Sequence, residues 1–167
     1  AKTDLWVHEL LQEANIHLTP QGGDIKEIAE ALKTASKSKT GNAGYPEYCG
    51  VVKDFILVIE DKASLAKHIY KDENDLLSQE VKVVKDYAVN GALHYALHLA
   101  VNTSYNKIIA LGVSGNEKHH RITPIFVNER GDYQELSDVE TFISFNEANV
   151  DEYYPVSYTH LRAHETC

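Results

Sequence analysis

The fold is decided by one stretch of the sequence, Tyr45-Pro-Glu-Tyr-Cys-Gly-Val-Val-Lys-Asp-Phe-Ile-Leu-Val-Ile-Glu-Asp-Lys62. Residues 47–52 and 55–62 form two runs rich in valine, isoleucine and aromatic residues, and the polar pair Lys53-Asp54 lies between them. This pattern predicts two antiparallel strands joined by a tight turn. Both faces of the pair are apolar except at one end, which favours a sheet covered by helices on both sides.

A turn at Lys53-Asp54 places Glu47 on the first strand directly opposite Glu60 on the second strand. Lys62 lies two residues further on and therefore points to the same face of the sheet. Two facing carboxylates repel each other, and a divalent cation such as Mg²⁺ would relieve this repulsion, with the carbonyl of Asp61 as a further ligand. Lys62 would orient a water molecule or stabilise negative charge. Two acids and a lysine on one strand pair are thus suited to metal-assisted hydrolysis of a phosphodiester.

The remaining sequence predicts helices before, between and after further strands. Apolar residues at helical spacing indicate helices over about 4–15, 24–32 with Asp24 as N-cap, and 79–99. Residues 107–113 and 121–127 are predicted to be strands, and 36–44 a loop. The capping box that runs from Ser137 to Glu140 predicts a last helix over residues 142–145. We therefore expect an α/β fold, a single domain with a mixed central sheet flanked by helices.

Composition limits the classes of protein that the chain can belong to. It has 167 residues, of which 43% are hydrophobic, and a formal net charge of −9, which excludes a protein that holds nucleic acid mainly by bulk positive charge. The sequence has no apolar run of membrane-spanning length, so we expect no membrane partner. Two cysteines are too few for a disulfide framework and fit a reducing compartment, so a cytoplasmic location is expected.

Both ends of the sequence differ from those of an ordinary complete protein. The sequence contains no methionine, and residues 156–166 read as the in-frame translation of a sequencing-library adapter. We therefore expect residues 1–154 to be a domain, the N-terminal part of a longer protein, and residues 155–167 to be an artefactual tail. His160 and His164, which lie in this tail, are not interpreted as a metal site.

The motif around the predicted hairpin resembles the PD-(D/E)xK nuclease superfamily. Pro46-Glu47 is followed, after twelve residues, by Glu60-Asp61-Lys62. The local motifs G-x-P-E-Y and V-I-E-D-K-A are similar to the N-terminal nuclease domains of type I restriction enzyme R subunits, and to nuclease domains fused to N6-adenine DNA methylases. The resemblance implies a restriction-endonuclease-like fold.

The same resemblance implies a function and a set of site residues. It implies Mg²⁺- or Mn²⁺-dependent hydrolysis of double-stranded DNA in a restriction-modification system, with methylase or specificity regions on the same or a partner chain. Glu47, Glu60 and Lys62 take the catalytic positions, and Glu47, Glu60 and Asp61 would hold the metal. Glu47 departs from the aspartate of the pattern. One alternative is therefore an inactive nuclease-fold module that binds DNA or a partner, and another is a purely structural domain.

Two further helical features belong to the resemblance. Related nucleases carry an acid on the first helix, for which Asp4 and Glu13 are the candidates. They also carry a Q-A-x-x-Y-A signature, which residues 91–96 match with Gly91 in place of glutamine. Tyr95 would then face the site, and the glutamine would be missing unless Asn90 supplies an amide.

The other polar clusters have two readings each. Lys33, Lys37 and Lys39 precede the hairpin and either contact the DNA backbone or form a solvated loop. His94 and His98 lie one helical turn apart, as in zinc sites, but no third ligand has suitable spacing, so we expect a half-buried helix face. Because the chain is acidic, we expect it to bind DNA weakly on its own.

Overall fold

A six-stranded mixed sheet forms the centre of the protein. The computed structural model describes residues 2–154; the expected tail at 155–167 lies outside them. The strands follow one another across the sheet in sequence order, and only β3 and β4 are parallel neighbours. They are β1 (Thr19–Pro20), β2 (Tyr48–Val52), β3 (Phe55–Lys62), β4 (Lys107–Gly115), β5 (His120–Asn128) and β6 (Tyr133–Glu135). The predicted α/β class with a mixed central sheet is confirmed.

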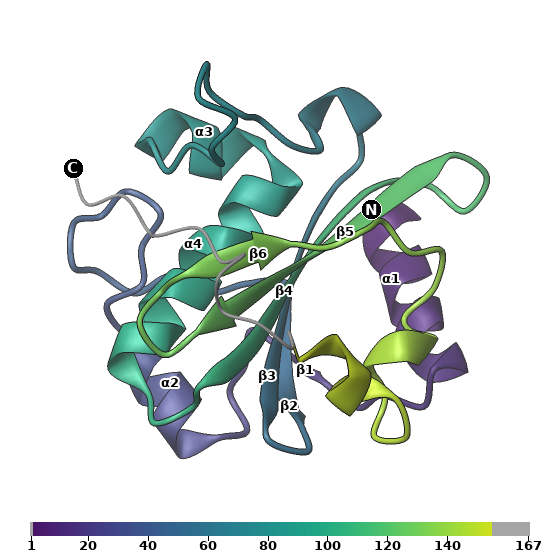
Figure 1. Cartoon of the computed structure of the whole chain (residues 1–167), viewed down its shortest axis with the longest axis horizontal. Helices are drawn as coiled ribbons and strands as arrows, with labels where there is room; N and C mark the ends of the chain where they lie inside the picture. The colour runs from purple at the N-terminus through teal and green to yellow at the C-terminus, as the bar shows by residue number, and fades with distance from the viewer. Residues whose placement is uncertain (1, 155–167) are drawn as a thin grey trace.

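Helices cover both faces of this sheet, as Figure 1 shows. On one face lie α1 (Lys2–Glu13) and the short 3₁₀ turns η2 (Ile143–Phe145) and η3 (Val150–Tyr153). On the other face lie α2 (Lys26–Leu32) and α4 (Ala88–Asn102). The two elements that complete the chain, η1 (Leu65–Lys67) and α3 (Val81–Asp86), belong to the connection between the parallel strands β3 and β4.

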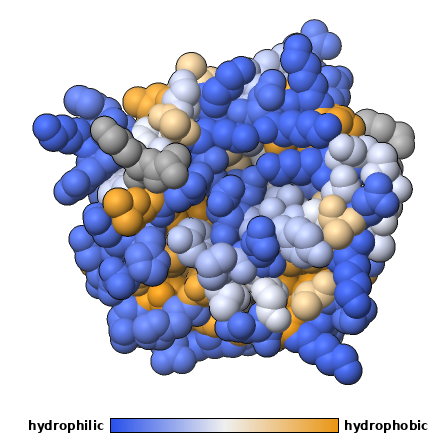
Figure 2. Space-filling view, turned by 180° about the vertical axis from the view of Figure 1, so that it is seen from behind, coloured by the Kyte–Doolittle hydropathy of each residue, from blue (hydrophilic) through white to orange (hydrophobic). Residues whose placement is uncertain are grey.

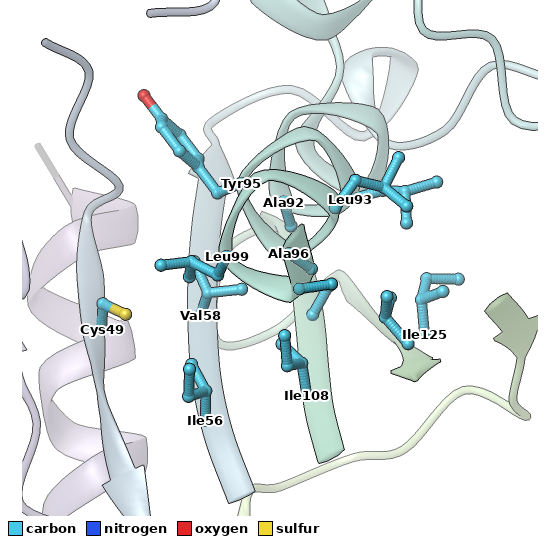
Figure 3. Close-up of a cluster of buried hydrophobic side chains, with 14 of the residues drawn as sticks. Cys49, Ile56, Val58, Ala92, Leu93, Tyr95, Ala96, Leu99, Ile108 and Ile125 are labelled. Carbon is cyan, nitrogen blue, oxygen red and sulfur yellow. The ribbon is translucent and has the colours of Figure 1, made fainter. Parts of the chain in front are cut away.

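Alternate residues of β3 feed the two halves of the hydrophobic core. Ile56 and Val58 pack against α2 and α4, and Figure 3 shows this cluster with Cys49 of β2 at its edge. Leu57 and Ile59 pack on the opposite face, against α1. Polar side chains cover most of the outer surface, and only small apolar patches interrupt them (Figure 2). Burial on both faces is why β3 reads as a continuous apolar run.

The hairpin has the predicted register. Tyr48 pairs with Ile59 and Val52 pairs with Phe55, so the turn falls at Lys53 and Asp54. Lys53 adopts a left-handed conformation with φ of 54°, which residues other than glycine adopt uncommonly. Because the register is correct, Glu47 and Glu60 meet at the end of the hairpin away from the turn.

The predicted helix over 79–99 is wrong as a single element, because it is divided at Tyr87. This residue is extended, with φ −116° and ψ 135°, and separates α3 from α4. The backbone N–H of Val89 at the start of α4 donates to the carbonyl of His68. The segment after β3 therefore satisfies an N–H group that a continuous helix would bond internally.

Three other details of the sequence interpretation are wrong. Asp24 is not the N-cap of α2, since the cap position is Ile25 and no side chain caps this end. The capping box at 137–140 does not open a helix: Val139 forms a bridge with Ile122, and the residues beyond it make only 3₁₀ turns. The very short strands β1 and β6 were not predicted. Every helix among residues 2–154 is too short or too polar to cross a bilayer.

Candidate metal centre

The polar residues predicted for the site gather where β3 ends and the chain enters β2. Because β2 begins at Tyr48, Glu47 lies just outside the ladder of paired residues. The backbone N–H of Glu47 donates to Oε1 of Glu60 over 3.0 Å. The hairpin therefore brings Glu47 and Glu60 together, as the sequence predicts. The first turn of α1 approaches from one face of the sheet, and α4 with the loop at 33–47 approaches from the other.

Three carboxylates from separate elements form a compact cluster at this end of the sheet. One oxygen each of Asp4, Glu47 and Asp61 lies within 4.8 Å of the other two. Asp4 is in the first turn of α1, and Asp61 points toward α1 because neighbouring residues of a strand alternate between the faces. Of the two acids considered on the first helix, Asp4 belongs to this cluster. Glu13 is exposed and lies nine residues, or roughly 13 Å, further along the helix.

Crowding of the carboxylates changes their acidity. Burial, then the neighbouring Asp4 carboxyl, then the charges of Glu47 and Glu60 raise the pKa of Asp61 to about 8. Burial also raises the pKa of Glu47, as do the charges of Asp4 and Glu60, and the charges of Lys37 and Lys62 oppose this effect. A cation between the carboxylates would favour their ionised forms.

The buried oxygen of Asp61 provides a direct test of whether the cluster fits a metal ion. Oδ2 of Asp61 is buried and accepts no hydrogen bond from any residue in the range 2–154. Such an atom loses its hydration without compensation unless a further group binds it. Oxygen ligands from three carboxylates are those that Mg²⁺ and Mn²⁺ prefer. The residues therefore fit one divalent ion of this type.

Glu60 does not belong to the compact cluster, although the sequence assigned it to the metal. Its side chain points to the opposite face of β3 from Asp61, toward α4, and only 4% of the residue is exposed. Oε2 accepts a hydrogen bond from Nζ of Lys37 at 2.5 Å, and Oε1 accepts the N–H of Glu47. Asp61 in turn offers its carboxylate to the cluster, whereas the sequence suggested its carbonyl.

Lys62 lies beside these acids on the same face as Glu60. Its Nζ donates to the backbone carbonyl of Lys85 at the end of α3, over 2.8 Å. Its positive charge lowers the pKa of Glu47. The ammonium group is half-buried and fixed by one hydrogen bond, which leaves two further N–H groups for other partners.

Tyr95 lies next to the pair of Lys37 and Glu60. Its ring is almost fully buried, and Nζ of Lys37 lies 5.6 Å from the ring centroid. Burial, then the charges of Glu60 and Glu47, raise the pKa of the Tyr95 hydroxyl. In Figure 3 the ring stands at the edge of the hydrophobic cluster, with the hydroxyl pointing away from Leu93.

The residues before Tyr95 explain the absent glutamine. Asn90 does not supply an amide to the site, because its side chain bonds the N–H and carbonyl of Tyr70 and the carbonyl of Ser78. A Cβ atom at Gly91 would lie 2.8 Å from the carbonyl oxygen of Val84 and 3.4 Å from Nζ of Lys37. A side chain therefore fits poorly at position 91 while Lys37 occupies this space.

The three lysines of the basic segment have separate environments. Lys33 pairs with Glu30 on the exposed surface of α2, and Lys39 donates to the carbonyl of Gln79. Only Lys37 reaches the acidic residues of the site. Its position in the site, rather than on an open loop, could not be read from the sequence because the loop at 36–44 has no periodic pattern.

The histidines at 94 and 98 pack on α4, as the sequence indicated. Their Nε2 atoms bond the carbonyls of Ala35 and Ala31, each over 2.8 Å. Burial lowers the pKa of His94 to about 4. Within residues 2–154, the cluster of Asp4, Glu47 and Asp61 is the one group of at least three metal-ligating side chains at binding distance.

Comparison with known proteins relates this arrangement to restriction-modification proteins. No protein-family profile matches the chain, and no solved structure gives a significant match. The chain is 33% identical over 157 residues to the type II restriction enzyme and methyltransferase RM.BcgI of Heyndrickxia coagulans. The match covers 93% of this chain and 24% of that protein, so the chain spans about a quarter of the length of its relative.

Proposed function

We propose that this chain is the metal-dependent DNA endonuclease module of a restriction-modification protein. One observation carries the proposal: carboxylates of Asp4, Glu47 and Asp61, within 4.8 Å of one another, lie beside the half-buried amine of Lys62. The similarity to a restriction enzyme and methyltransferase supports this assignment. The motif from Pro46 to Lys62 is that of a PD-(D/E)xK site, in which Asp4 and Asp61 extend the set of acids.

In this proposal Asp4, Glu47 and Asp61 hold one Mg²⁺ or Mn²⁺ ion. When bound, the ion would offset the negative charge of a DNA phosphate and acidify a water molecule. The buried oxygen of Asp61 would gain a partner, and the pKa of Asp61 would fall from about 8 because the ion favours the ionised carboxylate.

Lys62 would act on the reacting groups directly. Its bond to the carbonyl of Lys85 fixes the ammonium beside the acids, and its remaining N–H groups would bind an oxygen of the scissile phosphate. As water attacks phosphorus and one P–O ester bond breaks, negative charge grows on the phosphate oxygens. A fixed positive charge stabilises this charge more strongly in the transition state than in the ground state.

The substrate in this proposal is double-stranded DNA, and its recognition depends on other regions. The net charge of −9 opposes tight binding by this module alone. Because the chain spans about a quarter of its relative, methylase and specificity regions on the same or a partner chain would provide affinity and target choice. Residues 1–154 would form the nuclease domain of that longer, cytoplasmic protein.

Cleavage of supercoiled plasmid by the purified chain with Mn²⁺ or Mg²⁺ tests the proposal. The wild type should nick or linearise the plasmid, and Asp61→Asn and Lys62→Met should reduce the rate by at least about 100-fold, as expected for loss of a main charge-stabilising group. Asp54→Asn is the matched control, since Asp54 lies at the turn of the same hairpin and pairs with Lys107. Cleavage that is equal in all four proteins, or absent from the wild type, would contradict the proposal.

A further inference from the structure

We propose that Lys37 is a built-in cation that neutralises Glu60 and restricts the site to one divalent ion. This inference rests on the proposed metal centre formed by Asp4, Glu47 and Asp61. It assigns to Lys37 a role that the motif does not contain, and it explains why Glu60, the acid next to Asp61, stands apart from the cluster.

The contact between Lys37 and Glu60 is short and shielded from water. Nζ of Lys37 lies 2.5 Å from Oε2 of Glu60, and only 19% and 6% of the two side chains are exposed. The ring of Tyr95 lies 5.6 Å from the same Nζ and shields it on one side. An anion and a cation in so dry an environment interact strongly, and neither is easily replaced by water.

The loop that carries Lys37 is fixed in place at both ends. The N–H of Ser36 donates to the carbonyl of Asn42, and the N–H of Gly44 donates to the carbonyl of Leu32. A Cβ atom at Gly44 would lie 2.5 Å from the carbonyl oxygen of Ala35, so the two ends of the loop are in close contact. The carbonyl of Ala35 also binds the ring of His94 on α4. The backbone on either side of Lys37 is therefore held against the body of the protein.

The surroundings leave room for this lysine. An ideal Cβ at Gly91 would lie 3.4 Å from Nζ of Lys37 and 3.5 Å from Oε2 of Glu60. Any larger residue at position 91 would compete with Lys37 for the space next to Glu60. The glycine on α4 and the lysine on the loop thus form a matched pair.

The consequence concerns the number of metal ions. Glu60 and Glu47 are adjacent, since Oε1 of Glu60 bonds the N–H of Glu47. Without Lys37, the buried carboxylate of Glu60 and the carboxylate of Glu47 could hold a second ion next to the first, as in two-metal phosphodiesterases. The ammonium of Lys37 supplies positive charge at that position, so the second ion is excluded.

Counting bound Mn²⁺ tests the inference without any measurement of activity. Titration of the chain, followed by calorimetry and by the electron paramagnetic resonance signal of free Mn²⁺, should give one ion for the wild type and two for Lys37→Gln. The double variant Lys37→Gln/Glu60→Gln and the variant Lys37→Arg should return to one ion. Lys33→Gln, which removes an exposed lysine paired with Glu30, is the matched control and should bind one.

A second variant keeps the test decisive if Lys37→Gln does not fold. Glu60→Gln in the wild-type background should still bind one ion with an unchanged dissociation constant, because Lys37 already removes Glu60 from the ligand set. Loss of binding in this variant would overturn the inference, as would one ion in folded Lys37→Gln or two in the wild type.

Failure of the inference is distinguishable from failure of the proposed function. A wild type that binds one ion while Lys37→Gln also binds one overturns only the role of Lys37. A wild type and a Lys37→Gln variant that both bind none overturn the metal centre as well. Binding by Lys37→Gln alone would support the role of Lys37 and contradict the three-carboxylate centre.

Discussion

Replacement of Gly112 by alanine should destabilise the contact between helix α4 and strand β4, on which the geometry of the site depends. Gly112 pairs with Glu60 across the parallel strands. A Cβ atom at Gly112 would lie 2.4 Å from Cγ2 of Val89 and 2.6 Å and 2.7 Å from its Cα and N atoms. Two of these three atoms belong to the backbone of the first turn of α4, so a change of side-chain rotamer cannot relieve the overlap.

The structure gives the size of the expected effect. Overpacking of a core costs about 1–3 kcal/mol, and a backbone that must move places Gly112→Ala at the upper end, about 3 kcal/mol. In a domain of this size each kcal/mol lowers Tm by about 2–4 °C, which corresponds to a decrease of roughly 6–12 °C.

Thermal unfolding followed by circular dichroism measures this decrease. Gly23→Ala is the matched control, because no atom lies within 4 Å of its added Cβ, and its Tm should change little. Since the start of α4 carries Gly91, the displacement in Gly112→Ala should also weaken binding of Mn²⁺. Equal Tm values for Gly112→Ala and Gly23→Ala would refute the reasoning.

Three further predictions concern stability and reactivity. Asn90→Ala should lower the free energy of unfolding by about 2–4 kcal/mol, because buried groups that its amide bonds lose their partner, and faster hydrogen exchange over residues 70–78 would report the loosened loop; unchanged exchange would contradict it. Burial, then the charge of Arg121, lower the pKa of His68 to about 4, below its usual 6.5, so its contribution to stability is complete above pH 6.5 and is lost as the pH falls from 6.5 to 4. The decrease in Tm over that range should be smaller in His68→Gln, and identical pH profiles would oppose this assignment. Burial raises the pKa of the Cys49 thiol to about 12, so iodoacetamide should label Cys49 only after unfolding, and rapid labelling of the native protein would show that the thiol is accessible.

The central hairpin could be predicted because its signals are local. A polar pair between two apolar runs determines the turn, and the turn determines which residues face each other. The register from Tyr48 to Ile59 follows directly, and with it the meeting of Glu47 and Glu60. The assignment of apolar residues to two faces follows from the alternation of a strand.

The break between α3 and α4 could not be predicted, because its cause is distant in sequence. Residues 79–99 contain neither glycine before position 91 nor proline, and apolar residues continue through Tyr87. The break is stabilised by the carbonyl of His68, which binds the N–H of Val89. The ring of His68 is fixed in turn between Ser114 and Thr123 on neighbouring strands. Such contacts override local helix propensity.

The site was predicted in part for the same reason. The motif identified the correct end of the hairpin, but it assumed that ligands come from one face of the sheet. At the end of a strand both faces are within reach, so the carboxylate of Asp61 meets Asp4 while Glu60 meets Lys37 on the other side. Asp4 and Lys37 come from a helix and a loop whose approach depends on tertiary packing.

The central claim is that the carboxylates of Asp4, Glu47 and Asp61 hold one divalent ion beside Lys62. Anomalous diffraction from crystals of the chain soaked in Mn²⁺ tests this claim most directly, because it locates the ion independently of activity. We predict a single strong peak within coordination distance of these three carboxylates, which should be absent from crystals of Asp61→Asn. A peak bound instead between Glu60 and Glu47 without Asp4 and Asp61, or no peak at this end of the sheet, would contradict it.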